Sequence, residues 1–324
     1  MTGNHPALVV VAAGGLGTRV HHWARFIPKE FYPVDGRPGI VYLLEEIAAL
    51  GPARIAVVYH PYYEQFAAWA RQVLSQHDHA RYAHASRRDV PAVIPPGIAI
   101  SFIPQCGPYA DLTSVLNGAD YFGARANLCV AFADNLYRGP SPLPLLRSTA
   151  PGQVAVLASR YHPSLAASRG ILVTSSASSQ PRARRVLVLI EKPGPAQARE
   201  LEERHGSGNL LMLEGRARLT ASFIEFARAR QQAAHSPGTE PKLALAIGAY
   251  ARDHPVLAVL TDSGIIDLGM PTSSSTRIPR RTGTETGRGP AGPPAAPRPA
   301  GRPSADRARH RRPGGRVRGL QPGP

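Results

Sequence analysis

Residues 9–34 read VVVAAGGLGTRVHHWARFIPKEFYPV, an apolar run that leads into a glycine turn and then into a Pro-Lys-Glu box. Small residues after a short strand let backbone N–H groups close around phosphate oxygens. Arg19 and Lys29 add full positive charge to this turn. The stretch therefore predicts a site for the triphosphate of a nucleotide, and the turn residues expected to bind it are Gly14, Gly15, Gly17 and Thr18.

The turn lacks the defining residues of the two commonest glycine loops, the G-x-G-x-x-G of dinucleotide binding and the G-x-x-x-x-G-K-[ST] of the P-loop. The run 14–19, the seven residues after it and the box 27–30 instead resemble the signature of the sugar-1-phosphate nucleotidylyltransferases, most of all the bacterial UTP:glucose-1-phosphate uridylyltransferases. The resemblance implies an α/β fold, a Rossmann-like three-layer sandwich with a mixed, mostly parallel central sheet. It also implies transfer of a nucleotidyl group from an NTP to a sugar 1-phosphate, with UTP and glucose 1-phosphate the leading pair.

Lysine usage favours the same interpretation. Of 38 basic residues only three are lysines, Lys29, Lys192 and Lys242, so arginine serves almost wherever a generic positive charge is needed. A compact ammonium differs from a guanidinium fork in reach and hydration. Two of the three lysines lie in the family's motifs, although Lys29 could instead cap a surface turn. The resemblance assigns Arg19 and Lys29 to the triphosphate and the departing pyrophosphate.

Two aspartates are the candidate metal ligands. Asp134 follows an apolar strand, and Asp267 lies within IIDLG at 265–269. Ligands of open α/β proteins bind at the carboxyl edge of the sheet, and Mg²⁺ takes one or two carboxylates together with phosphate oxygens. Each aspartate matches one that coordinates Mg²⁺ in the family, so we expect Mg²⁺ as cofactor. The alternative for each is a helix N-cap or a turn.

The sugar end is assigned from the resemblance. Lys192 matches the lysine that holds the sugar phosphate, Glu191 the glutamate that accepts hydrogen bonds from the hexose, and Gly170 the glycine whose backbone lies against the sugar. Asn209 and the Gly215-Arg216 pair resemble the stretch that completes the hexose pocket.

The base pocket departs from the family pattern. Gln105 matches the glutamine that reads the pyrimidine edge, but Asp111 begins a DLTSV run where relatives have a glycine-rich one. Asp111 either obstructs the base or accepts a hydrogen bond from uracil or guanine. Arg169 also replaces a tyrosine, and Leu245 an acidic residue. The same reaction with dTTP or GTP and another sugar 1-phosphate, or a non-catalytic nucleotide-sugar-binding relative, therefore stays open.

Composition limits the remaining classes. A chain of 324 residues with 43% hydrophobic content can bury a substantial core. Two cysteines without C-x-x-C spacing suggest neither a disulfide framework nor structural zinc. We expect a cytoplasmic protein, since there is no signal peptide or apolar run long enough to span a membrane. Beyond the NTP and sugar 1-phosphate we expect no membrane partner, and the sequence leaves a homo-oligomer open.

The net charge of +16 is concentrated at the C-terminus. Residues 279–324 hold eleven arginines against two acidic residues, in a Gly/Pro/Arg-rich background with almost no large apolar side chain. Such a segment cannot offset its ordering entropy. We expect a catalytic domain at 1–278 and a disordered basic tail at 279–324. The tail lacks aromatic residues for base stacking, which argues against a nucleic-acid partner.

Strand-like and helical runs alternate along residues 8–267, which favours a mostly parallel sheet covered on both faces. Helices are expected at 38–50, 62–74, 111–122, 221–234 and 243–253. Strands are expected at 8–12, 55–59, 98–103, 128–132, 154–158, 170–173 and 185–190, with a last strand pair at 256–267. The His-rich stretch 77–88 has no readable conformation, and its histidines are more typical of a solvated loop than of a metal site.

Deleting the tail is expected to leave folding and turnover nearly unchanged, because a Gly/Pro/Arg segment contributes little buried area. The measurement compares the thermal midpoint and specific activity of the full chain with those of a variant ending at Ile278. A truncated protein that fails to fold, or loses most activity at equal concentration, would show that the tail packs on the domain.

Overall fold

The structure is a computed structural model, and it describes residues 6–18, 22–87, 93–123, 127–148, 152–176, 182–233 and 240–269. Arg19 lies outside these residues, as do the boundary expected at 278 and the basic tail. The division of the chain at 278 therefore stays a prediction. No helix within the described residues is long and apolar enough to cross a membrane.

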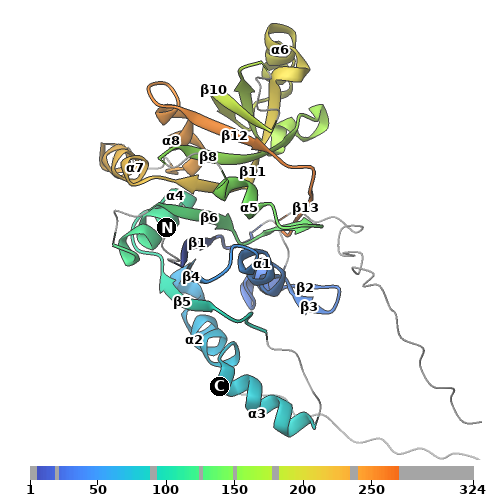
Figure 1. Cartoon of the computed structure of the whole chain (residues 1–324), viewed down its shortest axis with the longest axis vertical. Coiled ribbons are helices and arrows are strands. Elements are labelled where there is room, and N and C mark those ends of the chain that lie inside the picture. The colour runs from blue at the N-terminus through green and yellow to red at the C-terminus, as the bar shows by residue number, and fades with distance from the viewer. Residues whose placement is uncertain are drawn as a thin grey trace, which may run out of the picture. The chain divides into compact units, whose positions relative to one another are not determined.

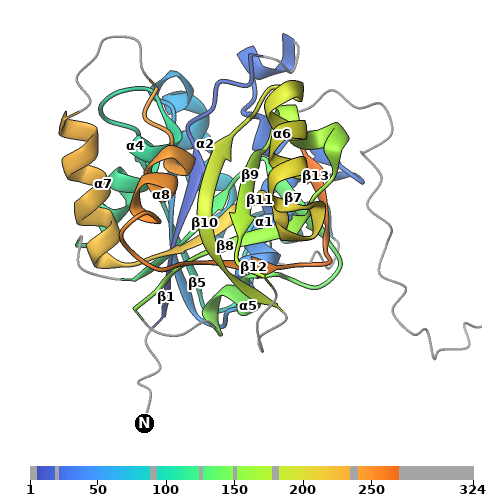
Figure 2. The same cartoon turned by 90° about the horizontal axis from the view of Figure 1, so that it is seen from above.

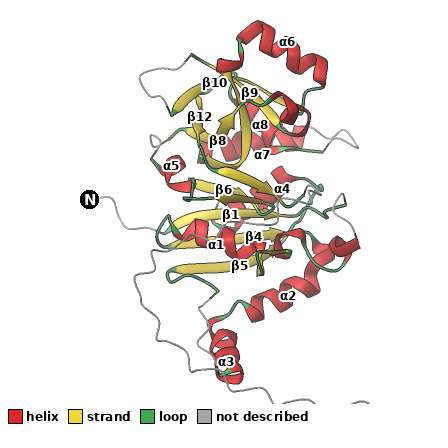
Figure 3. Ribbon diagram, turned by 90° about the vertical axis from the view of Figure 1, so that its right-hand side faces the viewer, coloured by secondary structure: helices red, strands yellow, loops and turns green. Residues whose placement is uncertain are grey.

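Nine strands of the described residues form one sheet (Figures 1 and 3). The first part of the sheet is parallel, with β1 paired on one side to β4 and on the other to β6, and with β5 beside β4. In spatial order the strands are β5 (Ile98–Pro104), β4 (Ala53–Tyr59), β1 (Ala7–Ala13), β6 (Leu128–Phe132), β11 (Leu210–Leu219), β8 (Val154–Arg160), β12 (Val256–Leu260), β10 (Ala183–Glu191) and β9 (Gly170–Thr174).

Antiparallel pairing enters at β11, which runs against β6, β8 and β9. β10 is likewise antiparallel to β12 and β9, while β12 and β8 are parallel. The sheet is thus mixed, and its parallel part carries the glycine turn and Asp134 at strand ends. Val9, Val10 and Val11 of β1 are all fully buried, as expected for a strand covered on both faces.

Helices cover both faces of the sheet and confirm the expected three-layer α/β sandwich (Figure 2). One hydrophobic cluster lies under α4, α7 and α8, and another lies under α1 and α5. Of the other helices, α2 packs on the edge strand β5 and α6 packs on β11. Their bounds are α1 (Gly39–Ala48), α2 (Glu64–Val73), α4 (Asp111–Tyr121), α5 (Leu143–Arg147), α6 (Pro195–His205), α7 (Ala221–Ala233) and α8 (Leu243–Tyr250).

The stretch that had no readable conformation contains a helix, α3 (Gln76–Ser86). It begins at Ser75, whose Oγ accepts a hydrogen bond from the N–H of Asp78 at 3.1 Å, and Asp78 also pairs with Arg81. Ser followed three residues later by an acidic residue is an N-terminal capping pattern. Among the described residues no group of three or more His, Cys, Asp or Glu side chains could hold a metal, in α3 or elsewhere.

The expected strand pair at 256–267 is wrong in its pairing. Two strands form, but β12 joins the main sheet, whereas β13 (Gly264–Asp267) pairs antiparallel with β7 (Asn135–Arg138). A second small sheet joins β2 (Pro33–Val34) to β3 (Arg37–Pro38). Short 3-10 helices occupy η1 (His22–Arg25), η2 (Lys29–Phe31), η3 (Pro61–Tyr63), η4 (Pro163–Ser168) and η5 (Ser207–Asn209).

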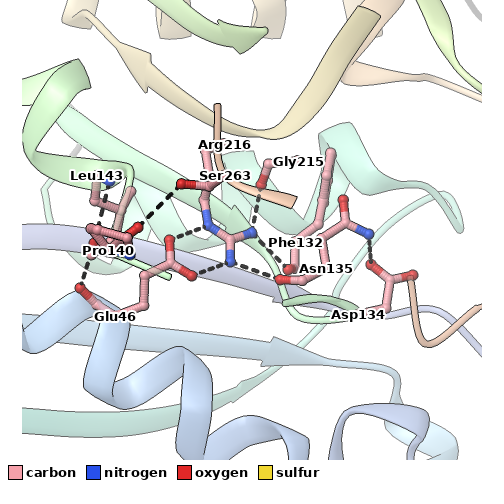
Figure 4. Close-up of polar contacts among 10 residues, drawn as sticks. Glu46, Phe132, Asp134, Asn135, Pro140, Leu143, Gly215, Arg216 and Ser263 are labelled. Carbon is pink, nitrogen blue, oxygen red and sulfur yellow. Dashed lines mark hydrogen bonds and ion pairs between the residues drawn. The ribbon is translucent and has the colours of Figure 1, made fainter. Parts of the chain in front are cut away.

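A buried ion pair ties these elements together (Figure 4). Arg216 of β11 is 1% exposed and donates to both carboxylate oxygens of Glu46 in α1, at 2.8 and 2.7 Å. Its other N–H groups reach the carbonyls of Gly215 at 2.8 Å, Phe132 at 3.1 Å and Asn135 at 2.8 Å. All five donors of the guanidinium are thus engaged. The pair fixes the end of β6 and the turn that follows it.

Replacing Arg216 by Met is expected to lower the free energy of unfolding by about 3–5 kcal/mol, because it leaves the Glu46 carboxylate buried without its partner. Urea denaturation checks this. The exposed pair Arg204–Glu200 on α6 supplies the control, and Arg204→Met is expected to cost less than about 1 kcal/mol. Equal losses in the two variants would contradict the assignment.

Candidate active site

One cavity of about 310 Å³ lies where strand ends of both parts of the sheet meet. Segments far apart in the sequence contribute to it, from the glycine turn after β1 to the end of β13. The structure therefore gathers most of the predicted site residues at one place. These are Gly14, Gly15, Lys29, Asp111, Asp134, Gly170, Glu191, Lys192 and Asp267.

Space is tight at the first two glycines of the turn. A Cβ on Gly14 would lie 2.2 Å from Oε1 of Gln105, and one on Gly15 would lie 3.1 Å from Nζ of Lys29. Gly17 has a φ of +61°, a conformation that suits glycine. Gly17 and the exposed Thr18 are not among the residues that line the cavity.

Lys29 and the two aspartates form a compact charged cluster. Nζ of Lys29 contacts Oδ2 of Asp134 in a largely buried ion pair. Gly269 marks where the cluster converges, because a Cβ there would lie 3.0 Å from Oδ1 of Asp267, 3.4 Å from Oδ2 of Asp134 and 3.9 Å from Nζ of Lys29. The N–H of Gly269 donates to Asp267 at 2.7 Å. Residues 105 or more positions from Lys29 therefore share one small volume with it.

The small β7–β13 sheet brings the aspartates together. Asp267 lies opposite Asn135 in the register, so it is next to Asp134 across the pair. The N–H of Leu268 also donates to the carbonyl of Asp134 at 2.8 Å. Backbone pairing thus fixes both carboxylates.

The charges in this cluster act on one another. Burial raises the pKa of Asp267, and the negative charge of Asp134 raises it further. Burial alone would lower the pKa of Lys29, but Asp134 and Glu30 outweigh it and the pKa is raised. Glu30 is 2% exposed, and burial raises its pKa to about 7. The site therefore keeps a fixed cation beside two carboxylates that repel each other.

Two such carboxylates fit a divalent cation. Mg²⁺ keeps several waters and takes one or two protein carboxylates together with substrate phosphates. A cation between Asp134 and Asp267 would relieve the repulsion that raises the pKa of Asp267. The donor set is thus suited to Mg²⁺ in the presence of a phosphate ligand.

Gly170, Glu191 and Lys192 lie together at another part of the cavity wall. Glu191 is opposite Gly170 in the β10–β9 register, and its Oε2 would be 3.1 Å from a Cβ on Gly170. Lys192 has a φ of +49°, which is uncommon for a residue other than glycine, and its N–H donates to the carbonyl of Arg169. The ammonium groups of Lys192 and Lys242 lie 3.8 and 4.0 Å from Oε1 of Glu191. All three lysines of the chain are therefore at or beside the cavity.

The two predicted base-binding residues both make internal hydrogen bonds. Nε2 of Gln105 donates to the carbonyls of Pro108 at 3.1 Å and Ala110 at 3.2 Å, and Gln105 is not among the residues that line the cavity. Asp111 lines the cavity, but its Oδ1 accepts from the N–H of Leu243 at 2.7 Å, at the start of α8. Burial raises the pKa of Asp111 to about 6. A hydrogen bond from either residue to a base stays a prediction.

Sequence reasoning missed several residues of the cavity wall. Tyr109 lines the cavity and accepts a hydrogen bond from the N–H of Leu16 at 3.0 Å. This bond ties the glycine turn to the loop between β5 and α4. Glu214 also lines the cavity and pairs with Arg169. Nothing local in the sequence marks these long-range partners.

Arg216, which the resemblance assigns to the hexose pocket, lines the cavity as expected, yet its donors are all used inside the protein.

Comparisons with known proteins agree with the motifs. The chain is 25% identical over 281 residues to the UTP–glucose-1-phosphate uridylyltransferase of Salmonella typhimurium, covering 80% of this chain and 87% of that enzyme. It is 27% identical over 141 residues to a glucose-1-phosphate thymidylyltransferase of Neisseria meningitidis, covering 44% of this chain and 42% of that enzyme. No family model matches the chain.

Solved structures agree on the fold. A UDP-glucose pyrophosphorylase from Acinetobacter baumannii superposes with a TM-score of 0.65 at 19% identity, covering 82% of this chain and 89% of that one. The resemblance expected from the motifs is therefore confirmed. In sequence the chain is similar to nucleotidyltransferases that act on glucose 1-phosphate, and in fold it is similar to a UDP-glucose pyrophosphorylase.

Proposed function

We propose that the protein transfers a nucleotidyl group from an NTP to a sugar 1-phosphate and releases pyrophosphate, with UTP and glucose 1-phosphate as substrates. One observation carries the proposal: a single cavity joins the glycine turn and Lys29 to Gly170, Glu191 and Lys192. The names of the relatives support the substrates, since a uridylyltransferase matches over most of the chain.

In the proposed reaction an oxygen of the sugar phosphate attacks the α-phosphorus of the NTP. The new O–P bond forms as the bond between the α-phosphorus and its bridging oxygen to the β-phosphate breaks, and the electron pair leaves with pyrophosphate. Little covalent work falls to the protein, so positioning and electrostatics account for most of the rate.

The two ends of the cavity would divide this work. The amides of the glycine turn and the ammonium of Lys29 would hold the triphosphate and stabilise the charge on departing pyrophosphate. Lys192 would orient the sugar phosphate, and Glu191 would accept hydrogen bonds from the sugar. Mg²⁺, held by Asp134 and Asp267, would supply further neutralisation of phosphate charge.

The choice of base rests on the relatives. A thymidylyltransferase is also among the relatives, and the hydrogen bonds that engage Gln105 and Asp111 leave the base contacts unassigned. The second candidate is therefore the same reaction with dTTP.

A pyrophosphate-release screen of the purified protein tests the proposal, with UTP, dTTP, GTP, CTP and ATP against a panel of sugar 1-phosphates in Mg²⁺. UTP with glucose 1-phosphate is expected to give the highest rate. Binding of both substrates without pyrophosphate release in any combination would instead indicate a non-catalytic nucleotide-sugar-binding relative.

Asp267→Asn is expected to lower turnover by at least ~10²-fold, because it removes one of two carboxylates that would hold the metal. Asp134→Asn is expected to do the same. In EDTA the thermal midpoint of Asp267→Asn is expected to stay unchanged or rise, since the repulsion with Asp134 is removed. Exposed Asp262 in the same segment supplies the control, Asp262→Asn. Wild-type dependence of the rate on Mg²⁺ concentration in both site variants would refute the metal assignment.

Lys192→Met is expected to weaken sugar 1-phosphate binding far more than NTP binding, and Lys29→Met to do the reverse or lower the catalytic rate itself. The reason is that the two ammonium groups lie at different parts of one cavity. Calorimetric titration of each variant with each ligand gives the ratio of the two dissociation constants. If both variants lose equal affinity for both ligands, this division of labour is wrong.

A further inference from the structure

Arg169 and Glu214 form an ion pair in the cavity wall that the proposed reaction does not use. Nη1 of Arg169 donates to Oε2 of Glu214 at 2.5 Å, and the second carboxylate oxygen accepts from Oγ of Ser159, also at 2.5 Å. Arg169 and Glu214 both line the cavity. Arg169 directly precedes Gly170.

The Glu214 carboxylate is buried and accepts a hydrogen bond on each of its two oxygens. Glu214 is 5% exposed, and burial raises its pKa to about 7 against the opposing effects of Arg169 and the Ser159 hydroxyl. A carboxylate in that setting needs its partners, because an unpaired buried charge is costly. Glu214 and Ser159 together therefore fix the position of the Arg169 guanidinium.

The Arg169 guanidinium uses few of its hydrogen-bond donors within the described residues. Arginine carries five N–H donors, and among the described residues the side chain of Arg169 makes one hydrogen bond, the one to Glu214. Its side chain is 21% exposed, in a wall of the cavity. As far as the described residues go, its remaining N–H groups have no acceptor and can donate to a ligand.

A hydrogen-bond acceptor lies on the other side of the same position. Glu191 is opposite Gly170 in the β10–β9 register, and Arg169 is the residue before Gly170. Donors and an acceptor therefore flank one glycine. Sugar hydroxyls both donate and accept, so they suit this arrangement.

The charges around Gly170 distinguish a neutral sugar from an acidic one. The charge of Arg169 is balanced by Glu214, and Glu191 adds a negative charge near Gly170. With Lys192 assigned to the phosphate, the cation left beside Glu191 is Lys242, whose Nζ lies 4.0 Å from its Oε1. Each of the two remaining cations, Arg169 and Lys242, is thus paired with a glutamate, and a sugar carboxylate near Gly170 would find neither of them unpaired.

We propose that Arg169, oriented by Glu214, is a specificity-determining residue whose N–H groups donate to the hydroxyls of a neutral sugar 1-phosphate. The inference rests on the proposed function, because it takes the Lys192 end of the cavity as the sugar end. Glu214 is a positioning residue that acts through Arg169.

Binding of deoxy sugars tests this directly. Glucose 1-phosphate, its 2-, 3-, 4- and 6-deoxy analogues and glucuronic acid 1-phosphate are titrated calorimetrically into protein saturated with Mg²⁺ and a UTP analogue that has a methylene between the α- and β-phosphorus. Wild type is expected to bind at least one deoxy analogue about tenfold to hundredfold more weakly than glucose 1-phosphate, the range for a hydrogen bond to a charged group.

Arg169→Met is expected to abolish that discrimination, so that glucose 1-phosphate binds as weakly as the affected analogue while the UTP analogue binds as in wild type. Glu214→Gln keeps the side-chain shape and is expected to reduce the discrimination partly. Arg169→Lys keeps the ion pair with Glu214 but lacks the planar guanidinium with its several N–H donors. It is also expected to lose the discrimination, and it keeps the test valid if the Met variant fails to fold. Exposed Arg160 on β8 is the matched control, and Arg160→Met is expected to discriminate like wild type.

The outcomes separate the inference from the proposed function. Wild-type discrimination retained in folded Arg169→Met or Arg169→Lys would overturn the role of Arg169, whatever the turnover. Tighter binding of glucuronic acid 1-phosphate than of glucose 1-phosphate would overturn the assignment to neutral sugars. Discrimination that depends on Arg169 in a protein that releases no pyrophosphate would support the inference and refute the catalytic function. No binding of any sugar 1-phosphate to wild type would overturn both.

Discussion

The buried Arg216–Glu46 pair is the interaction on which the site depends. Removing both charges from water costs several kcal/mol per ion, and the pair is tolerable only because every donor of the guanidinium has an acceptor. Two of these acceptors are the carbonyls of Phe132 and Asn135. They bracket Asp134, so the same guanidinium that links β11 to α1 also fixes the turn that presents this carboxylate (Figure 4).

The pairing of β13 with β7 is a second constraint, and it brings Asp267 into the charged cluster. The β7 strand begins directly after Asp134, and β13 pairs with it to deliver Asp267. Because Arg216 anchors Asn135, the first residue of β7, the position of β13 depends in turn on the buried pair. Lys29 then contacts Asp134 from the short helix η2. The β7–β13 pairing and the Lys29–Asp134 ion pair therefore align three segments, which are η2, the turn that holds Asp134 and β13.

Local patterns in the sequence predicted eight of the nine strands of the main sheet, five helices and eleven of the residues that line the cavity, because strand periodicity and the motifs depend on near neighbours. They did not predict β11, through which antiparallel pairing enters the sheet, or the helices α5 and α6. They did not predict α3, whose polar sequence lacks an apolar stripe and whose start depends on the Ser75 cap. They also mispaired β13, since a strand of four residues carries no signal for its partner. Ion pairs such as Arg216–Glu46, 170 positions apart, have no local trace in a single sequence.

The two arginines of the cavity wall show how hydrogen-bond satisfaction separates structure from ligand binding. Arg216 engages all five donors inside the protein and has none left for a substrate, although its motif suggested a place in the sugar pocket. Arg169 makes one side-chain hydrogen bond within the described residues and keeps part of its surface in the cavity. Both are paired with a buried glutamate, so the ion pair alone does not distinguish them. The number of unused donors does, because a buried guanidinium with unused donors is stable only where water or a ligand supplies the missing acceptors.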